Sequence, residues 1–201
     1  MDTAKAVIFA ASPRANGNSD AAAGAVARGM KDAGYEPEIV RLRDYEVTAC
    51  LGCSYCACNE KGFCILREKD QAEELFGKLL AAQAVVFSSP VYFYHLPAGF
   101  KAWIDRAQSY YMRREKGDPE MAHRSGLSAW VTMVAGRPRG EKLFEGSLLT
   151  LKYFLAPFGF EIRDSMTFRG KDAAGELEAD ADAVASLREF GKRIASELKA
   201  E

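Results

Sequence analysis

The chain has 201 residues, 48% of them hydrophobic and 27% charged, so it is long enough for one full α/β domain with a sizeable core. Its formal net charge of −1 argues against nucleic acid or an anionic membrane as the main partner, because both select basic surfaces. No stretch reaches the roughly 18 apolar residues that a membrane span needs. Residues 1–5 lead into a short apolar run without the pattern of a cleaved signal peptide. These features predict a cytoplasmic protein.

Short, continuously apolar segments alternate along the chain with segments of helical period. In chain order we expect a strand at 6–10, a helix at 19–32, strand 38–42, helix 70–82, strand 84–88, a helix opening at Pro97, strand 128–134, helix 143–156, strand 161–167 and a closing helix from Leu177. Continuously apolar strands are typical of parallel sheets covered on both faces. The pattern predicts an α/β fold, a flavodoxin-like doubly wound five-stranded parallel sheet with helices on both faces, in a single domain spanning residues 1–201.

The segment after the first strand, residues 12–19, combines small polar side chains, an arginine and a glycine directly before a helix. Ligands of doubly wound sheets bind beyond the carboxyl ends of the strands. A helix N-terminus offers a phosphate free N–H groups and the positive end of a dipole, and Arg14 adds a countercharge. The alternative is a polar turn in which Asn18 or Ser19 caps the helix. The segment is neither a Walker loop nor a Gly-x-Gly-x-x-Gly fingerprint.

Two further loops follow the third and fourth expected strands. Residues 89–97 contain three successive aromatic residues, which suit a planar ring system or, alternatively, pack into the core or against another subunit. His95 in this loop is expected to donate to the ring or to cap a turn, and not to act in catalysis. Residues 135–140 supply backbone donors, while Arg137 and Arg139 either meet the phosphates of a nicotinamide cofactor or are solvated surface charges.

Together the three loops resemble those of the NAD(P)H-dependent FMN reductase family. In that family a Ser-x-Arg-x-x-Gly-x-Ser type loop holds the FMN phosphate, a Pro-x-Tyr segment lies along the isoalloxazine ring, and a Pro…Lys…Asp-Arg helix is similar to residues 97–106 here. The resemblance implies non-covalent FMN, NAD(P)H as electron donor, and a homodimer or homotetramer whose contacts help enclose the flavin. No catalytic side chain is expected, because the flavin carries the chemistry. The implied cofactor-binding residues are Ser12, Arg14, Asn16, Asn18, Ser19, Pro90, Val91, Tyr92, Phe93, Ala135 and Gly136.

All five cysteines lie in a cysteine-rich loop at residues 50–64. Thiols stay reduced in the cytosol, so a disulfide framework is not expected. Cys50, Cys53, Cys56 and Cys64 give two successive Cys-x-x-Cys steps followed by a fourth sulfur. Such a triad can wrap three thiolates around one face of a [4Fe–4S] cluster before a later cysteine completes it.

This spacing resembles the compact motif of the iron–sulfur flavoproteins, a branch of the same family. Members commonly carry a paired-acid turn after the last cysteine, and residues 69–71 match it in part. Cys58 lies outside the motif, as a spare thiol or an alternative ligand. Cluster-free thiols that shape the flavin site, and a structural zinc held by four sulfurs, are the alternatives.

The predicted function is that of an FMN-dependent oxidoreductase. It is either an NAD(P)H-dependent flavin or quinone reductase, or an iron–sulfur flavoprotein that passes electrons between FMN and a [4Fe–4S] cluster and on to a ferredoxin-type carrier. One alternative is a flavodoxin-like electron carrier without substrate turnover, although such carriers tend to be more acidic than this chain. Another is a cysteine-based redox or metal sensor on the same scaffold. Steady oxidation of NAD(P)H distinguishes the enzyme from both.

Overall fold

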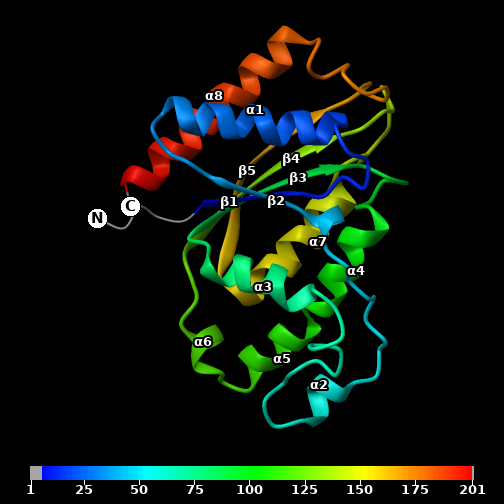
Figure 1. Cartoon of the computed structure of the whole chain (residues 1–201), viewed down its shortest axis with the longest axis vertical. Helices are drawn as coiled ribbons and strands as arrows, with labels where there is room; N and C mark the ends of the chain where they lie inside the picture. Colours follow the sequence, from blue (N-terminus) through cyan, green and yellow to red (C-terminus); the bar gives the residue numbers. More distant parts are fainter. Residues whose placement is uncertain (1–5, 201) are drawn as a thin grey trace.

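Five parallel strands form the centre of the structure, a computed structural model that describes residues 6–200 (Figure 1). They are β1 (Ala6–Ala10), β2 (Glu38–Arg41), β3 (Ala84–Pro90), β4 (Leu127–Val134) and β5 (Phe160–Phe168). The strands lie in the order β2-β1-β3-β4-β5, and each is parallel to its neighbours. This is the flavodoxin-like order of a doubly wound sheet. The fold class predicted from the sequence is therefore confirmed.

Helices cover both faces of the sheet (Figure 1). One face carries α1 (Asn18–Asp32) and α8 (Ala181–Ala200), and the other carries α3 (Ala72–Ala81), α4 (Ala98–Arg106) and α7 (Glu145–Leu155). A Cβ at Gly29 would lie 2.0 Å from the Arg188 carbonyl oxygen, so only glycine lets α1 and α8 pack this closely. The core on the α4 side is rich in aromatic rings, with Trp103 fully buried between Phe9 and Phe76. Because both faces are covered, β1, β3 and β4 are almost wholly buried.

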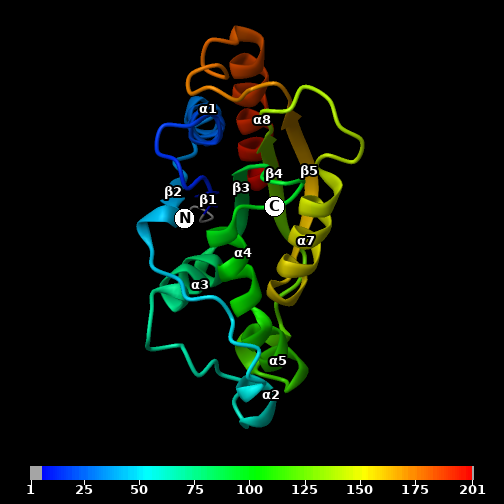
Figure 2. The same cartoon turned by 90° about the vertical axis from the view of Figure 1, so that its right-hand side faces the viewer.

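Three short helices lie at the end of the molecule opposite α1 and α8 (Figures 1 and 2). They are α2 (Tyr55–Cys58), α5 (Gln108–Glu115) and α6 (Pro119–Ala122). The two 3-10 turns are η1 (Leu42–Asp44) and η2 (Ala156–Phe158). The sequence analysis identified none of these short elements. In the part of the chain that the structure describes, no helix is long and apolar enough to cross a membrane.

The predicted strands agree with the structure to within two residues, but the start of the closing helix was wrong. The helix begins at Ala181 and not at Leu177, because the Asp180 carboxylate accepts the Ala183 N–H at 3.0 Å and caps the first turn. Leu177 instead lies in a preceding turn, fully buried. The helix that opens at Pro97 ends at Arg106, and α5 follows after Ala107.

Candidate cofactor site

A cavity of about 670 Å³ lies beyond the carboxyl ends of β1, β3 and β4. Its volume falls within the range of about 300–1,000 Å³ that is typical of small-molecule sites. Every residue predicted to bind cofactor lines it except Asn16: Ser12, Arg14, Asn18, Ser19, Pro90, Val91, Tyr92, Phe93, Ala135 and Gly136. Asn16 is exposed with a φ of 54°, and its N–H donates to the Asp20 carboxylate at 2.9 Å. The structure thus brings three loops, far apart in sequence, onto one cavity.

The loop after β1 presents polar groups to the cavity. The Ser12 hydroxyl closes the loop by accepting the Arg14 N–H at 3.2 Å and donating to the Arg14 carbonyl at 2.8 Å. The exposed Arg14 guanidinium donates to the Asp172 carbonyl oxygen at 3.0 Å. Ser19 is buried, and its Oγ finds no hydrogen-bond partner within residues 6–200. A buried hydroxyl without a partner carries a desolvation cost, which a ligand oxygen at this position would offset.

Asn18 has a structural task that the sequence did not reveal. The helix α1 is capped at Gly17 without a side-chain bond, so the alternative in which Asn18 or Ser19 caps it was wrong. The Asn18 amide instead donates to the carbonyl oxygens of Lys171 and Ala173, and its Oδ1 accepts the Leu177 N–H. This side chain fastens the segment after β5 to the start of α1.

The loop after β3 forms a tight, strained turn at the rim of the cavity. Tyr92 and His95 exchange both backbone hydrogen bonds at 2.9 Å, and Phe93 and Tyr94 between them have φ angles of 48° and 63°. Non-glycine residues in the left-handed region cost free energy and cluster at functional sites. The Phe93 side chain is fully exposed. The His95 ring pairs with Thr150 of α7 at 3.0 Å and does not line the cavity.

The loop after β4 packs against the loop after β3 and the segment after β5. A Cβ at Gly136 would lie 2.5 Å from an Asp172 carboxylate oxygen, so a larger residue here would displace the Asp172 side chain. Arg137 lines the cavity and donates to the Tyr94 hydroxyl at 3.3 Å, whereas Arg139 is exposed and not part of the lining.

The cavity has a fourth wall that was not predicted from the sequence, the segment after β5 that contributes Lys171 and Asp172. Tyr94 and Pro138 also line the cavity and belong to two of the loops expected there, whereas the lining residues Val134 and Leu143 were not predicted. A signal for the fourth wall was present, because the carboxyl ends of all parallel strands meet at one edge of a sheet. That rule, applied to the predicted strand at 161–167, points to the residues that follow it.

The cysteine segment forms a second, smaller cavity of about 170 Å³. The four cysteines of the predicted motif, Cys50, Cys53, Cys56 and Cys64, all line it, whereas Cys58 does not. Burial raises the pKa of the Cys56 thiol, and the neighbouring Cys64 and Cys50 raise it further. Among the described residues, no three or more His, Cys, Asp or Glu side chains already form a group that could hold a metal ion.

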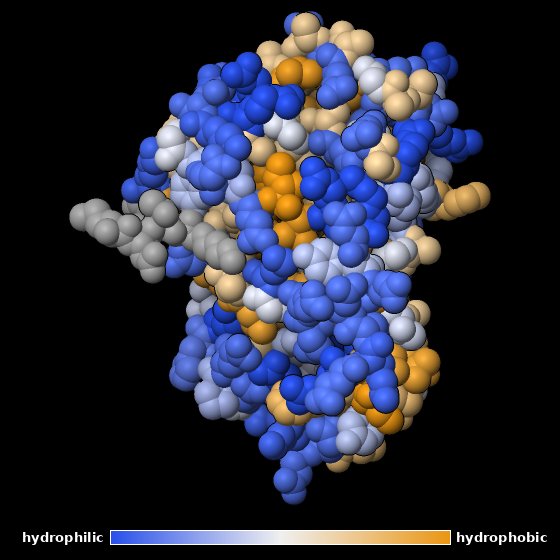
Figure 3. Space-filling model, in the orientation of Figure 1, coloured by the Kyte–Doolittle hydropathy of each residue, from blue (hydrophilic) through white to orange (hydrophobic). Residues whose placement is uncertain are grey.

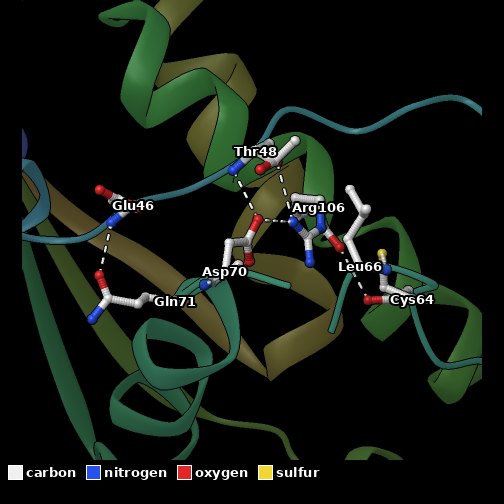
Figure 4. A network of polar contacts seen from close by, with 9 residues as sticks. Glu46, Thr48, Cys64, Leu66, Asp70, Gln71 and Arg106 are labelled. Atoms are coloured by element: carbon white, nitrogen blue, oxygen red, sulfur yellow. Dashed lines mark hydrogen bonds and ion pairs between the residues drawn. The ribbon is translucent and has the colours of Figure 1, made fainter. Parts of the chain in front are cut away.

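The chain on either side of the cysteine-rich loop is hydrogen-bonded together, residues 46–48 to residues 70–71, and we call this pairing the neck (Figure 4). Glu46 N–H donates to the Gln71 side chain at 3.0 Å, Gln71 N–H donates to the Glu46 carbonyl at 2.9 Å, and Thr48 N–H donates to the Asp70 carboxylate at 2.8 Å. Arg106 Nη1 reaches into the neck, 2.6 Å from Asp70 Oδ2 and 3.1 Å from the Thr48 carbonyl oxygen.

Asp70 is charged within a nearly dry environment. The exposed fractions of the Asp70 and Arg106 side chains are 4% and 1%. Burial raises the pKa of Asp70, but hydrogen bonds from the N–H groups of Thr48 and Ala72 and from the Arg106 guanidinium outweigh it, so this pKa lies below its ordinary value. The neck therefore contains a buried ion pair that is present at neutral pH.

The comparison with protein families identifies this arrangement. The family model described as NADPH-dependent FMN reductase matches residues 4–145, more than half of the chain. The chain belongs to this family. Within it, the chain falls in the branch of the iron–sulfur flavoproteins: it is 33% identical to the "Iron-sulfur flavoprotein" of Methanosarcina thermophila over 188 residues, which cover 94% of this chain and 92% of that protein.

Other proteins similar to this chain are named as oxidoreductases. An "FMN-dependent NADH:quinone oxidoreductase 2" from Xanthomonas euvesicatoria pv. vesicatoria is 27% identical over 146 residues, 65% of each chain. Among solved structures, an NAD(P)H:quinone oxidoreductase from Methanothermobacter marburgensis superimposes with a TM-score of 0.67 at 18% identity, covering 94% of this chain and 95% of that one. The protein is accordingly an oxidoreductase enzyme of the FMN reductase family, with the fold of that structure.

Proposed function

We propose that the protein binds FMN in the 670 Å³ cavity and uses it to oxidise NAD(P)H, passing the electrons to a quinone-type acceptor or to a carrier protein. The observation that carries this proposal is the gathering of the three predicted loops on one cavity with two chemically different ends. One end is polar and lies at the N-terminus of α1, whereas the other is lined by the apolar and aromatic residues that follow β3. A flavin mononucleotide has the same two ends, a phosphate and a planar ring.

The polar end fits a phosphate. Ser19 supplies a buried hydroxyl that lacks a partner among the described residues, and the first turn of α1 supplies backbone N–H groups and the positive end of its dipole. Arg14, held at the cavity by the Asp172 carbonyl, adds a positive charge. Asn18 contributes indirectly, since its side chain holds the segment after β5 against the helix.

The apolar end fits the ring. Pro90, Val91 and Tyr92 line one wall, and the tight turn between Tyr92 and His95 fixes the direction of that wall. When bound, FMN supplies hydride and single-electron chemistry, and the protein's share is to orient the ring and exclude water. Phe93, fully exposed at the rim, supports the expected homodimer or homotetramer, in which a neighbouring subunit covers it.

We also propose that Cys50, Cys53, Cys56 and Cys64, which line the second cavity, hold a [4Fe–4S] cluster. The support for this cluster is that the sequence spacing and the lining of the cavity contain the same four thiols, and that Cys58 belongs to neither set. The segment also exposes apolar side chains, Leu51 at 62% and Ile65 at 49%, and Figure 3 shows hydrophobic surface at this end of the molecule. A ferredoxin-type carrier is the partner that we propose for this surface. Reduced thiols of this kind agree with a cytoplasmic location.

The test is the absorption spectrum, flavin content and iron content of protein purified without oxygen, followed by steady-state oxidation of NADH and NADPH. We expect one FMN and about four irons per chain, with turnover on a quinone. Flavin without iron would leave a plain FMN reductase and would remove the cluster from the proposal. Neither flavin nor turnover after reconstitution with FMN would contradict the whole proposal.

A further inference from the structure

One buried guanidinium faces the four-cysteine cavity with most of its hydrogen-bonding capacity unused. Arg106, at the C-terminal end of α4, is 1% exposed and lines that cavity. Its Nη1 bonds to Asp70 and to the Thr48 carbonyl, but Nε and Nη2 have no partner within the described residues. Leaving such donors unpaired in a dry site costs free energy, so an acceptor is expected beside them.

The unused donors belong to the cysteine cavity and not to the FMN cavity. Arg106 and Cys64 line the same cavity, and Figure 4 shows Arg106 between the Asp70 carboxylate and the part of the chain that carries Cys64. The Cys64 sulfur already accepts the Leu66 N–H at 3.4 Å. The neck holds the guanidinium at this wall, because Asp70 and Thr48 both bind Nη1.

We propose that Arg106 is a positioning residue for the cluster, donating hydrogen bonds to sulfur in this cavity and raising the reduction potential of the iron–sulfur centre. The inference rests on the proposed function, because it needs the cluster. Reduction adds one electron to the oxidised [4Fe–4S]²⁺ centre and gives [4Fe–4S]⁺, with no bond or proton transferred, and reduced flavin supplies the electron. The added negative charge is stabilised by a fixed positive charge and by hydrogen bonds to sulfur, both of which raise such potentials.

The experiment compares four variants of the full chain with the wild type, all prepared without oxygen. Asp70→Asn removes the negative charge and keeps the guanidinium, and Asp70→Asn combined with Arg106→Gln removes both charges without leaving an unpaired carboxylate. Arg106→Lys keeps the positive charge but replaces the planar guanidinium, with its fork of N–H donors, by a single ammonium group. Lys101→Gln is the matched control, a charge loss on the same helix at a side chain that is 40% exposed. Iron and FMN per chain are measured first, and cluster reduction is then followed by electron paramagnetic resonance at controlled potential.

At a fixed ambient potential, we expect the double variant to show an at least tenfold lower ratio of reduced to oxidised cluster than the wild type, or 59 mV for one electron. Asp70→Asn is expected to raise the ratio, because it removes a nearby negative charge. Arg106→Lys is expected to lower the ratio by less than the double variant does, because the charge stays while the fork of donors is lost, and Lys101→Gln is expected to stay within threefold of the wild type. If Asp70 and Arg106 had only a structural role, the ratio of reduced to oxidised cluster would change in the same direction in the variants of both residues.

A double variant with about four irons and a ratio within threefold of the wild type would overturn the inference. Should the double variant bind no iron, the single variants decide: a higher ratio in Asp70→Asn together with a lower ratio in Arg106→Lys supports the inference, and a fall in both refutes it. A wild type without iron would instead refute the cluster itself, which is seen before any variant is compared.

Discussion

The buried pair of Asp70 and Arg106 gives the sharpest prediction for stability. Asp70→Asn removes a carboxylate that lies 2.6 Å from the guanidinium and also accepts the N–H groups of Thr48 and Ala72 at 2.8 and 3.1 Å. With both side chains at most 4% exposed, the variant leaves a buried positive charge without its counterion. Such losses cost about 3–5 kcal/mol, or about 6–20 °C in midpoint temperature for a chain of this size.

The assay is urea unfolding of the apoprotein, because bound cofactors would add their own stabilisation. The matched control is Asp105→Asn, which breaks the pair between Lys101 and Asp105 on the exposed face of α4 and should cost at most about 1 kcal/mol. A loss below about 1 kcal/mol for Asp70→Asn, equal to that of the control, would refute the view that the neck depends on this ion pair.

The pH dependence of the same variant checks the charge state. Since the pKa of Asp70 is lowered in the folded protein, its contribution is complete above the ordinary Asp value of about 3.9 and is lost as the pH falls through the folded pKa. The difference between wild type and Asp70→Asn should therefore be constant between about pH 5 and 8 and shrink in more acidic solution. A difference that persists unchanged at the lowest pH at which the protein folds would show that the carboxylate's charge is not the cause.

The remaining predictions concern the two cavities. Arg14→Ala should weaken FMN binding between about tenfold and a hundredfold, because a charge-assisted bond to phosphate is worth about 1.5–3 kcal/mol, whereas Arg139→Ala should leave the fluorescence titration unchanged. Ser19→Ala should weaken FMN binding while leaving the apoprotein as stable or slightly more so, since the hydroxyl has no partner in the part of the chain that the structure describes; a destabilised apoprotein with unchanged affinity would contradict this. Cys56→Ser should lower the iron content and Cys58→Ser should not, and equal iron in both would move the ligand set elsewhere.

The sheet could be predicted because each strand is a short apolar run with its own turn signals, so local pattern and global fold agree. The short elements near the cysteines could not. The four-residue α2 has no buried residue, and its N-cap Ser54 lies in the left-handed region. No periodic pattern of apolar residues therefore predicts this helix. The start of α8 was placed too early because buried Leu177 continues the apolar pattern of a helix that Asp180 begins later.

The candidate site was predictable where a motif lies in one stretch of sequence and not where distant segments meet. Ser12 and Arg14 could be proposed from a single loop, but the contact of Gly136 with Asp172 joins residues from two loops. In the same way, the Asp-Arg pair at the end of residues 97–106 was visible as a motif. That Arg106 turns toward the cysteines and Asp105 toward solvent depends on how α4 packs.

The neck makes the stretch between Thr48 and Asp70 an exchangeable unit. Its ends are tied together by hydrogen bonds that do not involve the cysteines, so these bonds do not depend on the thiols between them. Closing a longer loop costs little, about 0.6 kcal/mol for each doubling of its length. Over evolutionary time such a stretch can be lengthened, shortened or stripped of its thiols while the first cavity is left as it was. The segment proposed to hold the cluster could thus change without rebuilding the cavity proposed to hold FMN.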